Sequence, residues 1–178
     1  GLPEAEHVIL ELFDYTCPHC RDLHKHLHKV TEHYGDQLVI VAFPVPLNSS
    51  CNPAILHDSP KHQDACVYAK YSLAVCAEDP TKFQEFHDWM MKGEKQPSVA
   101  SARAEAEKLI ETGSLNEAIN QPRVQEWLDD GINLYKFTRL GGIPKLIAGK
   151  KVVTIKHTTL PDLLAFLEGN LGIKTASE

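Results

Sequence analysis

The sequence predicts an α/β fold that is interrupted by a block of helices. Apolar runs typical of strands occupy residues 7–14 and 37–43, and two shorter runs occupy 145–148 and 152–155. A helical pattern separates the first two runs, and another follows the last two. The residues between these halves, 51–139, carry helical patterns and no strand signal.

The first half predicts a strand, a helix and a second strand. Residues 7–14 are apolar at nearly every position, which is typical of a central strand covered on both faces. Residues 18–34 have one apolar stripe at helical spacing, and Gly35 ends that helix. The longest apolar run, Leu38 to Val45, predicts a buried strand that ends where Pro44 cannot donate to a ladder.

The rest of the chain predicts a loop, several helices and a closing ββα unit. Residues 47–60 have the composition of a loop, and a turn is expected at 114–119. The hairpin turns at Gly149-Lys150, and Thr158 or Thr159 caps the last helix before Pro161. The expected helices of this part are 62–76, 81–91, 99–111, 124–138 and 160–167.

A βαβ unit completed by a ββα unit is the order of the thioredoxin fold. We therefore expect a thioredoxin-like domain from residues 1–50 and 140–178, with a helical insertion at 51–139.

The apolar content of 43% is sufficient for a core, and a net charge of −6 argues against a nucleic-acid partner. No apolar run is long enough to cross a bilayer, and no signal peptide is visible at a start that is typical of a mature fragment.

Residues 17–20 read Cys17-Pro18-His19-Cys20, between the first strand and the first helix. This spacing brings two sulfurs within bonding reach on one helical turn, as in a dithiol/disulfide switch. Unpaired N–H groups and the helix dipole favour a thiolate on the first sulfur, and a protonated His19 would add positive charge.

Metal binding is the alternative function for these cysteines. A structural zinc site needs a second ligand pair at short spacing, which Cys51, Cys66 and Cys76 do not offer. His24 and His28 lie one helical turn apart, but nothing nearby in the sequence supplies a third ligand. We favour a solvated helix face for these histidines and predict no metal site and no cofactor.

The motifs 13–20 (FDYTCPHC) and Gly142-Ile143-Pro144-Lys145, with the helical insertion, resemble the DsbA-like family of thioredoxin-fold thiol–disulfide oxidoreductases. The resemblance implies that Cys17 is the attacking sulfur and that Cys20 reseals the pair.

It also implies further site residues. Pro144 is expected in the cis form facing the redox site, and Ile143 is expected to pair its backbone with the substrate. Glu11 matches the position of a buried acid in the family, which is expected to exchange protons with Cys20. The alternative is that Glu11 is a half-exposed carboxylate on the strand. Asp14 and Tyr15 are expected to line the approach to Cys17, with Asp14 capping the helix.

A second similarity concerns residues 46–53 and 65–66. They resemble the thioredoxin-like domains that accompany bacterial vitamin K epoxide reductase homologues. Cys51 and Cys66 are the expected second disulfide, which would tie the loop to the first inserted helix, although buried free thiols explain them equally well. Cys76 is expected to be a reduced core residue.

The resemblance to the DsbA-like family, which includes the inner residues Pro18 and His19, implies a periplasmic or otherwise extracytoplasmic enzyme that oxidises cysteine-containing protein substrates. The resemblance implies a membrane redox partner, either quinone-linked or of the vitamin K epoxide reductase type. A disulfide reductase or isomerase on the same fold, a metal-binding module and an inactive scaffold are the alternatives.

Overall fold

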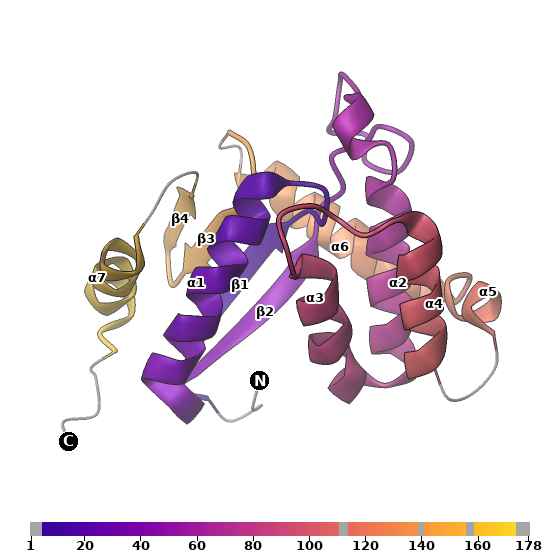
Figure 1. Cartoon of the computed structure of the whole chain (residues 1–178). Helices are drawn as coiled ribbons and strands as arrows, with labels where there is room; N and C mark the ends of the chain where they lie inside the picture. The colour runs from indigo at the N-terminus through magenta and orange to yellow at the C-terminus, as the bar shows by residue number, and fades with distance from the viewer. Residues whose placement is uncertain (1–4, 111–113, 139–140, 156–158, 174–178) are drawn as a thin grey trace.

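A four-stranded sheet and seven α-helices make up the described part of the chain (Figure 1). The computed structural model describes residues 5–110, 114–138, 141–155 and 159–173. The strands are β1 (His7–Phe13), β2 (Leu38–Pro44), β3 (Lys145–Ala148) and β4 (Lys151–Thr154). The helices are α1 (Pro18–Tyr34), α2 (Ala65–Glu78), α3 (Phe83–Met91), α4 (Val99–Leu109), α5 (Leu115–Ala118), α6 (Pro122–Thr138) and α7 (Leu160–Leu171).

The strand order is β2-β1-β3-β4, which makes β1 a central strand as predicted. β1 runs parallel to β2, with His7 opposite Leu38, and antiparallel to β3, with Glu11 opposite Leu146. β3 and β4 form the predicted hairpin. β2 lies at the edge of the sheet and Val41 is 38% exposed, so the expectation of a buried strand was wrong for part of this run. A long apolar run does not distinguish an edge strand that is covered by helices from a central one.

Two groups of buried side chains form the core. One lies between the sheet, α1 and α7, and includes Ile9, Leu27 and Leu167. The other joins the helices α2–α6 to the loop after β1. In Figure 1, α1 crosses in front of the sheet, α6 passes behind it, and α2–α5 pack beside it. Gly131 lets α6 approach closely, because a Cβ there would lie 2.8 Å from the carbonyl oxygen of Pro44.

Most predicted element ends agree with the structure to within a few residues. α1 has the predicted bounds, and Gly35 ends it with φ of 54°. The turn expected at 114–119 contains the single-turn helix α5, which Ser114 caps. Thr159 caps α7 as expected, but that helix continues to Leu171. The predicted end of the 99–111 helix falls outside the described residues, which place the last turn of α4 at Leu109. None of the helices in the described ranges combines the length and apolarity that a bilayer span requires.

Candidate active site

The turn between β1 and α1 presents the two cysteines. Cys17 is the N-cap residue of α1, with extended backbone angles (φ −86°, ψ 118°), and Pro18 occupies the first helical position. The N–H of Cys17 donates to the carbonyl oxygen of Asp14 at 3.1 Å, which closes the turn. The Cys17 side chain makes no capping hydrogen bond, and its position at the N-cap places it at the helix N-terminus, where the helix dipole favours a thiolate.

The two sulfurs differ in their surroundings, and both are in the free thiol form. Cys17 is 5% exposed, whereas Cys20 has no exposed surface. A hydrogen bond from the Cys20 thiol lowers the pKa of Cys17, and the backbone N–H groups of Cys20 and His19 lower it further against the effect of burial. Burial raises the pKa of Cys20 well above its ordinary value, as does its bond to Cys17. One sulfur is thus set to ionise and the other to stay protonated.

The backbone N–H of His19 is among the causes that lower the pKa of Cys17. The His19 side chain is half-buried, and Pro18 beside it is exposed. A contribution from the charge of the His19 imidazole stays a prediction.

The segment before β3 lies against Cys17. The Ile143–Pro144 peptide bond is cis. The Cys17 sulfur is 3.9 Å from the carbonyl oxygen of Ile143, which places the backbone of this segment at the redox pair. The Ile143 residue is 5% exposed and its side chain belongs to the core.

Glu11 is a buried carboxyl group on the central strand. It is 1% exposed, and its Oε1 has no hydrogen-bond partner among the described residues. Burial raises the pKa of Glu11 to about 8, so that the side chain can gain or lose a proton near neutral pH. The expected burial of this acid is therefore observed, and the half-exposed strand carboxylate is excluded.

Asp14 and Tyr15 do not have the positions expected from the sequence. The Asp14 carboxylate accepts hydrogen bonds from Thr16 and, at 2.6 Å, from the N–H of Leu47, so it braces the loop and does not cap α1. Tyr15 is 2% exposed, and its hydroxyl is hydrogen-bonded to His87 Nδ1 at 3.0 Å. The Tyr15 side chain therefore faces the core and does not line the approach to Cys17. Closeness in sequence to Cys17 does not determine which way a loop side chain points, which explains both errors.

Arg21 is a site residue that sequence reasoning missed. It lies one helical turn after Cys17 and is 2% exposed. Its guanidinium donates to the carbonyl oxygens of Met90 and Tyr15, each at 2.7 Å. It thus ties the cysteine loop to the C-terminal turn of α3. The sequence shows that Arg21 follows Cys17 by four residues. It does not show which two backbone carbonyl oxygens the Arg21 guanidinium contacts.

The remaining cysteines are of two kinds. Cys51 and Cys66 form a disulfide that joins the loop after β2 to the first turn of α2. Cys76 is a free thiol and is half-buried on α2.

The chain is similar to known thioredoxin-fold proteins. A family model described as thioredoxin matches residues 1–168. None of the curated proteins is significantly similar to the chain. Among the solved structures with the same fold are those of three proteins. ScsC from Proteus mirabilis is 22% identical, with a TM-score of 0.74 over 97% of this chain and 70% of that one. The thiol-disulfide exchange protein α-DsbA2 from Wolbachia pipientis is 20% identical, with a TM-score of 0.73 over 95% of this chain and 84% of that one. BdbD from Bacillus subtilis is 17% identical, with a TM-score of 0.74 over 97% of this chain and 91% of that one. With a sheet of the expected order and a family match over most of its length, the chain belongs to the thioredoxin family.

Proposed function

We propose that this protein is a thiol–disulfide oxidoreductase that exchanges disulfides with cysteine-containing proteins through Cys17. The observation that carries the proposal is the asymmetry of the pair. Cys17 has a lowered pKa at a helix N-terminus, while Cys20 is fully buried with a raised pKa. A low-pKa sulfur is a good leaving group in disulfide exchange, and the more accessible sulfur is the one that an incoming thiolate reaches.

In the oxidising direction, the cycle begins with a Cys17–Cys20 disulfide. A substrate thiolate attacks the Cys17 sulfur, the bond between the two cysteines breaks, and Cys20 leaves as a thiolate that takes up a proton. A second substrate thiolate then attacks the substrate sulfur of the mixed disulfide, and Cys17 leaves as a thiolate. The substrate gains a disulfide, and its two electrons reside in the reduced pair.

Glu11 and Ile143 are assigned supporting roles. A carboxyl group whose pKa is raised to about 8 can give a proton to the departing Cys20 thiolate and take it back on reoxidation. The Ile143 carbonyl, 3.9 Å from the Cys17 sulfur, can accept a hydrogen bond from the backbone of an extended substrate whose cysteine faces Cys17. Pro18 and His19 form the exposed and half-exposed rim of the motif next to the reacting sulfur.

We assign the direction as oxidation, in an extracytoplasmic compartment. A stabilised Cys17 thiolate favours the reduced pair, which makes the disulfide form an oxidant. The Cys51–Cys66 disulfide is consistent with an oxidising compartment, and one similar structure is a periplasmic thioredoxin-like protein from Salmonella enterica. A membrane protein that passes electrons to a quinone, directly or as a vitamin K epoxide reductase homologue, would reoxidise the pair.

The reduction potential of the pair tests the direction. The protein is equilibrated in glutathione buffers, and the fraction of reduced Cys17–Cys20 is measured by alkylation and mass spectrometry. A potential near about −120 mV, with oxidation of a reduced unfolded protein, is expected for an oxidase. A potential near about −270 mV, as in thioredoxin, would instead assign the reductase function.

Metal binding by the cysteine pair is not supported. Among the described residues, the cluster of potential ligands consists of two histidines and an aspartate and contains neither Cys17 nor Cys20.

A further inference from the structure

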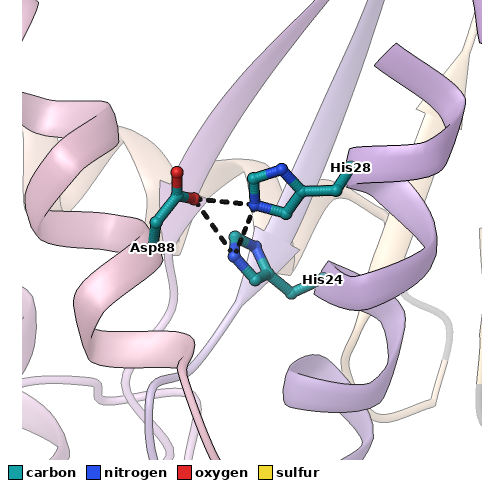
Figure 2. Close-up of side chains that lie close together, drawn as sticks. All are labelled: His24, His28 and Asp88. Atoms are coloured by element: carbon teal, nitrogen blue, oxygen red, sulfur yellow. Dashed lines mark hydrogen bonds and ion pairs between the residues drawn. The ribbon is translucent and has the colours of Figure 1, made fainter. Parts of the chain in front are cut away.

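Two histidines of α1 and an aspartate of α3 converge on one point (Figure 2). His24 Nε2 lies 3.2 Å from Asp88 Oδ1, and His28 Nε2 lies 2.9 Å from the same oxygen. The two Nε2 atoms are 3.1 Å apart. The sequence offered His24 and His28 as a pair without a third ligand, and the fold supplies that ligand from a helix sixty residues later in the chain.

With the Asp88 carboxyl ionised, no arrangement of protons satisfies all three contacts. If both Nε2 atoms carry hydrogens, each can donate to Asp88, but the two N–H groups then oppose each other at 3.1 Å. If only one of them carries a hydrogen, the other histidine turns a lone pair toward the carboxylate oxygen. A cation bound to one side of the plane of the triangle would accept a lone pair from each of the three atoms and remove this conflict.

The spacing suits a transition-metal ion. Zinc binds histidine nitrogen and carboxylate oxygen at about 2.0–2.1 Å, and tetrahedral angles then separate neighbouring ligand atoms by about 3.3 Å. The three separations of 2.9, 3.1 and 3.2 Å lie within a few tenths of an ångström of that value. Two imidazoles and a carboxylate are a ligand set that zinc and similar borderline ions accept.

The surroundings support the ligands. The His24 side chain is 9% exposed, so the expectation of a solvated helix face was wrong for this residue. Gln84 donates to Asp88 Oδ1 at 2.7 Å, which orients the carboxylate. His24 and His28 also line a cavity of about 50 Å³ together with Glu11, whose buried Oε1 has no partner among the described residues. A buried polar atom of this kind, at the same cavity, is a second sign that the cavity receives a polar occupant.

We propose that His24, His28 and Asp88 bind one divalent transition-metal ion of the zinc type, with solvent as the fourth ligand. The ion would link α1 of the thioredoxin-like part to α3 of the inserted helices. Because the ligands are brought together only in the folded protein, binding would stabilise the fold. The proposal is independent of the chemistry assigned to Cys17.

The test uses the full chain with the Cys17–Cys20 pair oxidised, so that its thiolates cannot bind the metal. Protein stripped with a chelator is titrated with Zn²⁺ by calorimetry and with Co²⁺ by visible spectroscopy. We expect one ion per chain, a Co²⁺ spectrum typical of tetrahedral nitrogen and oxygen ligands, and a Tm that rises with Zn²⁺. His28→Gln and Asp88→Asn should each weaken Zn²⁺ binding by at least about tenfold, since even groups that only orient ligands are worth about 10–100-fold.

His33→Gln is the matched control, because it places the same substitution on an exposed histidine of the same helix. It should leave the affinity unchanged. Far-ultraviolet circular dichroism and Tm in chelator show whether each variant is folded, and the half-exposed position of His28 favours a folded variant. Absence of Zn²⁺ binding to the oxidised wild type, or equal affinity in folded His28→Gln, folded Asp88→Asn and wild type, overturns the proposal.

Discussion

Both cysteine pairs of this protein can form a disulfide, but their surroundings in the fold differ. Cys17 and Cys20 lie on the first turn of α1 as free thiols with pKa values moved in opposite directions. Cys51 and Cys66, 15 residues apart, are joined by a disulfide between a loop and α2. The first pair therefore has the features of an exchangeable switch, and the second those of a permanent link. What separates them is burial, since the residue type is the same: Cys17 and Cys20 are buried, whereas Cys51 and Cys66 are half-buried.

Removing the attacking sulfur should give the largest effect. Cys17→Ser is expected to lower the rate of disulfide exchange with a reduced model protein by at least about a thousandfold, because no other sulfur can take its place. Cys20→Ser, offered a disulfide-bonded substrate, should instead accumulate a mixed disulfide at Cys17, because its thiolate breaks the substrate disulfide and no second sulfur resolves the product; mass spectrometry detects it. The control is Cys76→Ser, which removes a free thiol outside both pairs. Comparable loss of activity in that control would remove the distinction between the cysteines.

Removing the second pair should affect stability and spare the chemistry. Cys51→Ala with Cys66→Ala opens a loop of 15 residues, which is expected to lower the free energy of unfolding by about 3 kcal/mol. Urea unfolding followed by circular dichroism measures this change. The folded double variant should keep its exchange rate within about twofold of the wild type. A large loss of exchange activity in the folded variant would show that the second pair takes part in the reaction.

The buried carboxyl group of Glu11 should make the free energy of unfolding depend on pH. An ordinary glutamate ionises near 4.5, whereas the pKa of Glu11 is about 8. Between these values the unfolded chain releases this proton and the folded chain keeps it. The free energy of unfolding should then fall as pH rises, by at most about 1.4 kcal/mol per pH unit. Glu11→Gln should flatten this part of the profile, measured by urea unfolding in the presence of a chelator. An unchanged slope would mean that Glu11 ionises normally.

The smallest effect concerns the hydrogen bond from the Cys20 thiol to the Cys17 sulfur. The hydrogen bond from the Cys20 thiol is the main cause that lowers the pKa of Cys17. Cys20→Ala removes this donor, so the pKa of Cys17 should rise while the helix N–H groups still act on it. Ultraviolet absorbance of the thiolate follows the titration. If the pKa stays unchanged, the helix terminus alone accounts for the shift.

Local patterns in the sequence were sufficient for much of the fold and for the redox pair. The apolar stripe of residues 18–34 and Gly35 determine a helix through its own turns, and α1 has those bounds. The two-residue spacing of Cys17 and Cys20 at the helix start likewise depends on neighbours in the chain. The edge position of β2 and the burial of Tyr15 were predicted wrongly, because each depends on what another element covers.

The sequence by itself determined the order of strands and helices and the presence of a dithiol at a helix N-terminus. Only the tertiary structure decided which distant groups meet. Arg21 reaches the carbonyl of Met90, and His24 and His28 meet Asp88, across α1 and α3. The physical reason is the distance along the chain over which each kind of interaction acts. Helical periodicity and capping act over a few residues, whereas these contacts depend on how two helices pack, which no local pattern specifies.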